Sequence, residues 1–535
     1  MTFWIRWPLT MLCSIVSVCS AAAPHVPASG AVRAEHLADV VGLARAIDRR
    51  IGAGLKDRGV TPAPRADDYE FARRVYLDLT GRIPKTSEVR AFLDDRSPDK
   101  RSRLVERLLR SPNYVTHFTY QWRSLLVGNS TNQQVQFLNP QIENWARSRV
   151  RDNVPYDRIV RELLTVPVVA GRGMTPTSNS AAVFYQINEL KPDMLAAATS
   201  RLFLGVKLEC AQCHDHPFAN WTRKQFWEYT AFFGGIKPQS VVAGVFSPAT
   251  DNPNVREIAI GDTNKKVQAK FLDGSEPNWK PDVSTRETLA EWMTRPDNPF
   301  FARAVANRMW EHFFGVGLVD PVDDFRDENP ASHPELVDEL AKGFVASNFD
   351  LKFLIRAIIA TETYQRTSQM THPTQEDLRS FARMPLKGLT PEQVFDSLAT
   401  AVGYRGDTGD LTRRFGVQSA RNEIQSRFTN PVDRRTEVQT SILQALSLMN
   451  GKFVADATSL DRSETLLAVI DSPFMNTKDK LDTLYLAALS RPMRESEASR
   501  LLPYVTTGGP SRDSRKALAD VFWVLLNSSE FILNH

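Results

Sequence analysis

Residues 208–218, LECAQCHDHPF, hold two cysteines three positions apart and a histidine directly after the second. The other two cysteines, Cys13 and Cys19, lie in a segment that we expect to be removed, so Cys210 and Cys213 would be the mature chain's only pair. Two sulfurs at this spacing can form thioethers to the two vinyl groups of haem, and the next histidine can then ligate the iron. The motif therefore predicts haem c, bound by Cys210 and Cys213, with His214 as the proximal iron ligand.

Two other interpretations of the motif remain open. Cys210, Cys213, His214 and His216 have the residue types of a zinc site, although four ligands within seven residues strain a tetrahedral geometry. Alternatively, the two cysteines form a local disulfide, which an oxidising compartment favours, and no cofactor is bound.

The start of the chain has the layout of a secretory signal peptide. Arg6 precedes an apolar run from about Leu9 to Val18, and the small residues Ser20–Ala23 follow. We expect cleavage after residue 22 or 23, hence a periplasmic or extracellular protein. No later apolar run reaches the roughly 18 residues of a membrane-spanning helix, so we expect no stable membrane span.

Composition indicates a globular protein. Hydrophobic residues make up 42% of the chain and the net charge is only +4, with basic and acidic residues interleaved, which argues against a nucleic-acid partner. Apolar residues recur with helical spacing over most of the chain, whereas residues 236–283 contain short β-branched runs between turn residues. The predicted fold is mostly α, with two helical domains and a small β insert. Its segments are a signal peptide (1–23), a variable segment (24–64), a helical domain with the motif (65–235), the insert (236–283) and a second helical domain (284–535).

Two distant stretches of the chain resemble each other. YLDLTGRIPKTSEVRAFL, near the start, is similar to YLAALSRPMRESEASRLL at 485–502, and LLRSPNY or LLNSSEF follows in each case. The similarity predicts two copies of one helix–turn–helix unit.

A second group of polar residues lies in the C-terminal half. Arg308 and His312 are four positions apart and share a helix face with Trp310 close by, and the next loop contains Asp324 and His333. These side chains could line a cleft that holds a substrate or a haem propionate, but we favour an Arg308–Asp324 ion pair that fastens the loop. The iron's sixth ligand must come from another segment, unless that position is open. We rank His312 first, because Arg308 and Trp310 suit propionate and porphyrin contacts.

Several long motifs resemble one known family. RLFLGVKLECAQCHDHPFANWTRKQFWEYTAFFGG is similar to the signature of a planctomycete cytochrome-c-like family, domain of unknown function 1549. NPFFARAVANRMWEHFFGVGLVDPVDDF and the ending LLNSSEFILNH resemble its companion, domain of unknown function 1553. The resemblance covers most of residues 65–535 and implies an exported, haem-c-like protein without a settled reaction.

Two functions of different classes are therefore expected. The first is an exported redox protein, either an electron carrier or an oxidoreductase of unknown substrate, which would need a periplasmic redox partner. The second is a non-catalytic exported scaffold or binding protein whose CxxC forms a disulfide or a metal site. The sequence indicates neither a substrate nor an oligomeric state.

Overall fold

The computed structural model describes most of the chain, namely residues 29–128, 133–168, 180–217, 219–238, 249–261, 263–404, 421, 424, 436, 449 and 451–535. The expected signal peptide, residues 1–23, and residues 239–248 of the expected β insert lie outside the described residues. Val40–His535 form one compact unit, and the described residues before Val40 are not part of it.

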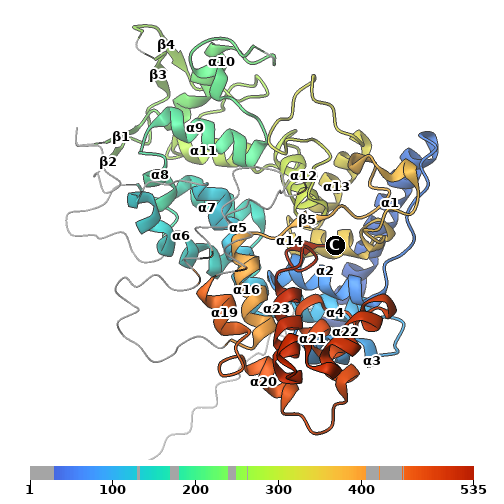
Figure 1. The fold of residues 1–535 in the computed structure, drawn as a ribbon. Coiled ribbons are helices and arrows are strands. Elements are labelled where there is room, and N and C mark those ends of the chain that lie inside the picture. Colours follow the sequence, from blue (N-terminus) through green and yellow to red (C-terminus); the bar gives the residue numbers. More distant parts are fainter. Residues whose placement is uncertain are drawn as a thin grey trace, which may run out of the picture. The chain divides into compact units, whose positions relative to one another are not determined.

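Helices make up nearly all of the regular structure before residue 236, as the spacing of apolar residues predicts (Figure 1). The α-helices are α1 (Ser29–Asp57), α2 (Asp68–Thr80), α3 (Thr86–Asp94), α4 (Lys100–Leu109), α5 (Pro112–Val127), α6 (Gln133–Arg151), α7 (Tyr156–Thr165), α8 (Val183–Ile187), α9 (Pro192–Thr199) and α10 (Arg223–Thr230). The π-helical turn η1 (Ser200–Leu204) and the 3-10 helix η2 (Glu209–Gln212) lie between α9 and α10. A second 3-10 helix, η3 (Ala231–Phe233), follows α10.

The strands are short and form two-stranded antiparallel sheets. In the expected insert, β1 (Ile236–Pro238) pairs with β2 (Ala249–Asp251), and β3 (Glu257–Ala259) pairs with β4 (Lys266–Gln268). A third sheet joins β5 (Lys387–Gly388) to β6 (Leu533–Asn534), so residues 533–534 pair with the segment just before α16 (Pro391–Val402).

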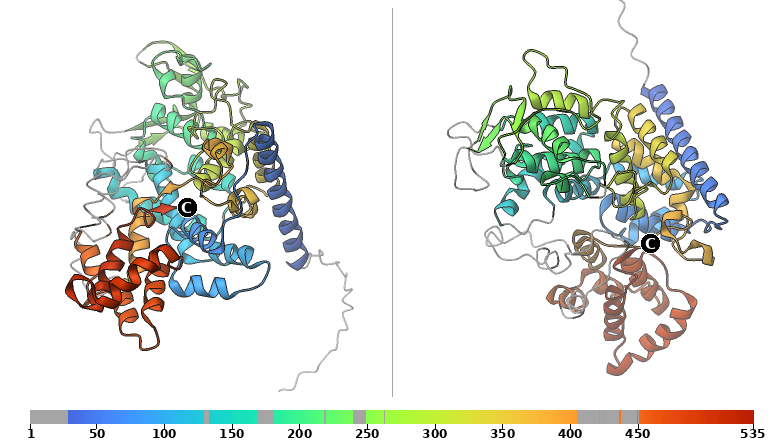
Figure 2. Two further views of the ribbon diagram at one scale, coloured as in Figure 1. Left: turned by 45° about the vertical axis from the view of Figure 1, so that its right-hand side comes forward. Right: turned by 90° about the horizontal axis from the view of Figure 1, so that it is seen from above.

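The remaining segments are again helical, which confirms the expected mostly α fold with a small β insert. The helices are α11 (Thr285–Met293), α12 (Phe301–Phe314), α13 (Pro334–Ala346), α14 (Leu351–Ala360), α15 (Glu362–Gln365), η4 (Pro373–Gln375), η5 (Leu378–Ser380), α16 (Pro391–Val402), α19 (Lys452–Ala457), α20 (Glu464–Ile470), α21 (Thr477–Leu489), α22 (Glu495–Thr507), η8 (Gly509–Ser511) and α23 (Ser514–Leu526). In both views of Figure 2, the red helices near the C-terminus stay together as one group. Among the described residues, no helix has both the length and the apolar character to cross a membrane.

Two hydrophobic cores hold these helices together. One core draws its buried residues from Val40 to Met384, and the other combines Leu77 and Ile83 with residues 389–531. Helix α2 therefore packs into both cores, with Phe71 and Val75 in the first and Leu77 in the second. The cores thus meet along α2, and apart from Leu77 and Ile83 the buried residues of the second core all follow residue 384.

A buried polar cluster, which we call the Asp78 cluster, lies where the cores meet. Asp78 on α2 accepts hydrogen bonds from Lys387 Nζ at 2.7 Å, Asn534 Nδ2 at 2.7 Å and Tyr364 Oη at 2.8 Å. Lys387 also donates to the carbonyl oxygens of residues 312 and 313 at the end of α12. Asp78 and Lys387 are fully buried, so each charge depends on these partners.

The two similar sequence stretches have the same local structure. Each first helix ends at a left-handed residue, Gly81 after α2 and Ser490 after α21. The next residue is an arginine that pairs through both terminal nitrogens with a glutamate six positions on: Arg82 with Glu88, and Arg491 with Glu497. That glutamate also accepts a hydrogen bond from the backbone N–H three positions before it, at the start of the second helix.

The correspondence continues after the second helix of each copy. In LLRSPNY, Ser111 donates to the carbonyl of residue 108 and accepts from the N–H of residue 114. In LLNSSEF, Ser528 makes the same two bonds with residues 525 and 531. The equal hydrogen bonds at equal offsets support the interpretation as two copies of one helix–turn–helix unit.

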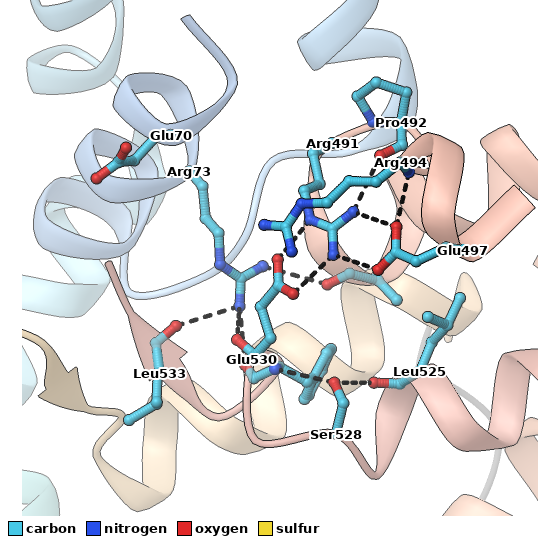
Figure 3. A network of polar contacts seen from close by, with 12 residues as sticks. Glu70, Arg73, Arg491, Pro492, Arg494, Glu497, Leu525, Ser528, Glu530 and Leu533 are labelled. Carbon is cyan, nitrogen blue, oxygen red and sulfur yellow. Dashed lines mark hydrogen bonds and ion pairs between the residues drawn. The ribbon is translucent and has the colours of Figure 1, made fainter. Parts of the chain in front are cut away.

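The side chain of Arg73 connects the two copies (Figure 3). Arg73 on α2 is fully buried and donates to the carbonyl oxygens of residues 488, 530, 531 and 533 in the C-terminal copy. Arg491 pairs with Glu530 as well as with Glu497. The hydrogen bonds of Arg73 thus join α2 to the C-terminal copy, whereas the ion pairs of Arg491 hold that copy together internally.

Candidate functional site: the CxxCH loop

The cysteine motif forms a short surface loop. The π-helical turn η1 ends at Gly205, which has a left-handed φ of 70°, and the chain then enters η2 with Cys210 in it and Cys213 directly after it. Both cysteines are free and exposed, while Leu208 and Ala211 beside them are buried. The buried side chains anchor the loop, and the thiols are left accessible to a reactant from solvent.

His214 is exposed, and the hydrogen bond of its ring shows which nitrogen is available. Its Nδ1 lies 2.7 Å from the carbonyl oxygen of Asp215. A carbonyl oxygen only accepts, so Nδ1 must be the donor and the lone pair of the neutral ring is at Nε2. Histidines that ligate metals commonly donate their other N–H in this way.

Helix α10 supports the loop between the two cysteines. The carbonyl oxygen of Gln212 accepts hydrogen bonds from Trp227 Nε1 at 3.1 Å and from Arg223 Nε at 3.3 Å. The Gln212 side chain donates to Asp193 on α9 at 2.8 Å. Asp215 in turn accepts from the backbone N–H of Arg223 at 2.8 Å. The loop is therefore held on both sides of Cys213.

Residues of the C-terminal half contact the segment that leads into the motif. Arg308 on α12 donates to the carbonyl oxygens of Leu202 and Arg201, at the end of η1. The N–H of Phe325 donates to the carbonyl of Gly205 at 2.9 Å. A Cβ at Gly205 would lie only 2.8 Å from the Phe325 ring. Both this close approach and the left-handed φ therefore require glycine at this position.

The expected Arg308–Asp324 ion pair is wrong. Arg308 binds backbone carbonyls instead, and Asp324 pairs with Arg326 at 3.2 Å within its own loop. The physical reason is the course of the loop, which places the backbone of η1 rather than Asp324 at the guanidinium.

The structure does not bring His312 to the motif. His312 is buried, and its Nε2 lies 3.0 Å from the carbonyl oxygen of Asp78. Its ring centroid is 5.8 Å from that of His117 and 5.4 Å from that of Phe118. This places His312 between α2, α5 and α12, where it contributes to the interior, and the geometry gives no support to His312 as a distal ligand.

Trp310 is likewise an interior residue. It is fully buried and stacks on Phe314 with 4.2 Å between ring centroids, while Phe381 meets it edge-on at 5.2 Å. A porphyrin or a substrate could not reach its ring. The proposed cleft is therefore not formed by the predicted residues, which lie apart: Arg308 at η1, Asp324 in its loop, and Trp310 in the core.

His333 is buried and hydrogen-bonded on both sides of its ring. Arg58 donates to Nε2 at 2.8 Å, and Ser332 Oγ lies 3.2 Å from Nδ1. Burial and the positive charge of Arg58 lower the pKa of His333 to about 4. The ring is thus neutral at physiological pH and acts as an acceptor in a structural contact.

This environment makes His333 a source of acid sensitivity. Because its pKa is about 4 in the folded protein and 6.5 ordinarily, the unfolded chain binds the extra proton first as pH falls. The neutral His333 ring contributes its full share of the free energy of unfolding above pH ~6.5. This contribution, on the order of 3 kcal/mol, is lost progressively as the pH falls from ~6.5 to ~4. Urea unfolding of His333→Gln, whose amide oxygen can still accept from Arg58, should show a smaller loss of stability between pH 7 and pH 4.5 than the unchanged protein. Equal losses in the two proteins would contradict this.

A cavity lies away from the motif, beside the turn between α2 and α3. Its volume is about 950 Å³, and α16 and α20 contribute further lining residues. Its charged side chains are of both signs: Arg82, Lys85, Arg90, Asp94, Glu392, Asp396, Arg421 and Glu464. This cavity could not be predicted from the sequence, because its walls come from segments about 300 residues or more apart and only the RIPKTSE turn has a local sequence signal.

The residues of the motif can be compared with what each candidate cofactor needs. Among the residues that the structure describes, no three His, Cys, Asp or Glu side chains group as a metal site, so the zinc interpretation gains no geometric support. Covalent haem attachment needs two accessible thiols and a histidine with a free ring nitrogen beside them. Cys210, Cys213 and the Nε2 of His214 fit this requirement.

Two regions of the chain match known protein families. Residues 46–238 match a family described as protein of unknown function (DUF1549), and residues 285–410 match one described as protein of unknown function (DUF1553). No curated protein and no solved structure matches the chain. The CxxCH loop lies in the first region, and the residues that contact its approach, Arg308 and Phe325, lie in the second.

Proposed function

We propose that this chain, in which a DUF1549 region precedes a DUF1553 region, is an exported c-type haem protein that transfers electrons. Cys210 and Cys213 bind the haem, and His214 Nε2 is the proximal iron ligand. The observation that carries the proposal is the hydrogen bond from His214 Nδ1 to the Asp215 carbonyl, beside two exposed free thiols. The haem would supply a one-electron redox centre at the surface, where a periplasmic partner can approach.

The chain's own residues would supply the attachment points for the haem and hold them in position. Cys210 and Cys213 would hold the haem through thioether bonds to its two vinyl groups. Gln212, held by Trp227 and Arg223, fixes the peptide between the two sulfurs. The hydrogen bond from its Nδ1 to the Asp215 carbonyl would leave the Nε2 of His214 available to the iron.

The proposal is tested by producing the full chain in the bacterial periplasm together with the cytochrome c maturation proteins. We expect a mass increase of one haem that survives denaturation, and reduced-minus-oxidised visible bands typical of haem c. Cys210→Ser/Cys213→Ser should lose all covalent haem, and His214→Ala should lose the spectrum of a histidine-ligated iron.

The matched control is His372→Ala, which removes an exposed histidine far from the motif in the sequence. Its haem content and spectrum should equal those of the unchanged chain. Unchanged protein without covalent haem would refute the proposal.

A non-catalytic exported binding protein is the second candidate. The charged 950 Å³ cavity beside the α2–α3 turn supports it, because its size suits a small-molecule ligand. Absence of haem in the experiment above would favour this alternative.

A further inference from the structure

We propose that the start of helix α10 sets the tautomer of His214, with Asp215, Arg223 and Trp227 as positioning residues that present Nε2 to a ligand. The inference rests on the proposed function only in naming haem iron as that ligand. The hydrogen bonds themselves belong to this chain without any cofactor.

The first step concerns Asp215, whose backbone carbonyl binds His214 and whose side chain binds the start of α10. Its carbonyl oxygen accepts from His214 Nδ1, and its side-chain Oδ1 accepts from the N–H of Arg223, the first residue of α10. A carboxylate at a helix N-terminus is favoured by the helix dipole and by the unpaired N–H groups there. The acceptor of the histidine proton is therefore fixed to the end of a helix.

The second step concerns the rigidity of that helix end. Thr222 caps α10 by accepting from the N–H of Gln225, while the Gln225 side chain accepts from the N–H of Thr222. Next to it, the N–H of His216 donates to the carbonyl of Trp221 at 2.8 Å and closes the loop. The backbone next to Asp215 is thus held by the hydrogen bond between His216 and Trp221, which leads to the capped start of α10.

The third step concerns the residue before Cys213. The Gln212 carbonyl accepts from both Trp227 and Arg223, side chains one turn apart on the same helix. Trp227 is nearly buried and packs edge-on against Phe226, so its indole N–H has little freedom to choose another acceptor. One helix therefore determines the position of the loop on both sides of His214.

The test measures the tautomer directly by nitrogen NMR of the full chain, labelled with ¹⁵N-histidine and produced without haem maturation. Spectra are recorded where the ring is neutral, and His214→Ala assigns the signal. We expect the Nδ1–H tautomer for His214 in the unchanged chain. Asp215→Ala keeps the backbone carbonyl but removes the side-chain oxygen that binds the N–H of Arg223, so it should shift His214 to the Nε2–H tautomer that exposed histidines favour in water. Asp215→Asn keeps a side-chain acceptor for that N–H and should retain the Nδ1–H tautomer.

Two further variants complete the test. Trp227→Phe keeps the ring but removes its donor, and it should also shift His214 toward Nε2–H. Asp513→Ala removes a carboxylate that accepts from a backbone N–H in the first turn of another helix, α23, and should leave the His214 signal unchanged. An Nε2–H tautomer in the unchanged chain, or an unchanged tautomer in both Asp215→Ala and Trp227→Phe, would overturn the inference.

The outcome is separable from that of the proposed function. A chain that shows the Nδ1–H tautomer but never acquires haem keeps this inference and loses the redox proposal. A chain that acquires covalent haem while His214 is Nε2–H in the haem-free form keeps the redox proposal and loses this inference.

Discussion

Replacement of Lys387 by methionine is expected to lower the free energy of unfolding by about 3–5 kcal/mol, because it leaves a buried carboxylate without its counter-ion. Lys387 Nζ lies 2.7 Å from Asp78 Oδ1, and both side chains are almost completely shielded from solvent. Tyr364 and Asn534 would still donate to Asp78 but cannot neutralise its charge. Urea unfolding followed by far-UV circular dichroism measures the change.

A double variant separates the charge effect from simple loss of packing. In Asp78→Leu/Lys387→Met both charges are gone, so its loss of stability should be smaller than the sum of the two single losses. The exposed pair Arg151–Asp152 provides the control, since Arg151→Ala should leave the unfolding midpoint in urea essentially unchanged. Additive losses at Asp78 and Lys387 would show that the two side chains do not act as a pair.

Trp310→Ala is expected to cost a similar amount, about 3–5 kcal/mol, because it empties a large, fully enclosed site in the first core. The rings of Phe314 and Phe381 would lose their contacts with the indole and could fill the space only in part. Thermal unfolding and urea unfolding should both show the loss.

The control for Trp310 is an aromatic residue on the surface. Phe474 is 93% exposed in the loop before α21, so Phe474→Ala should leave stability within about 0.5 kcal/mol. If Trp310→Ala were equally mild and instead altered haem binding or a substrate interaction, the interior role assigned to Trp310 would be wrong and the cleft interpretation would regain its basis.

The sequence by itself predicted those features that depend on residues close together in the chain. Helical spacing of apolar residues predicted a mostly α fold, and short β-branched runs predicted the small strands between residues 236 and 268. The repeated turn is another local feature, since Arg82–Glu88 and Arg491–Glu497 are each only six residues apart. The spacing of Cys210, Cys213 and His214, on which the proposed haem attachment depends, is equally local.

The tertiary structure alone decided which polar and aromatic residues face the interior. Helix α12 carries Arg308, Trp310 and His312 within two turns, and its pattern does not reveal that Arg308 meets η1 while Trp310 and His312 enter the core. Burial depends on which helices pack against each face, and those helices come from distant segments. The Asp78 cluster shows this most plainly: the partners Asp78 and Lys387 are 309 positions apart, so only the folded chain could bring the two charges together.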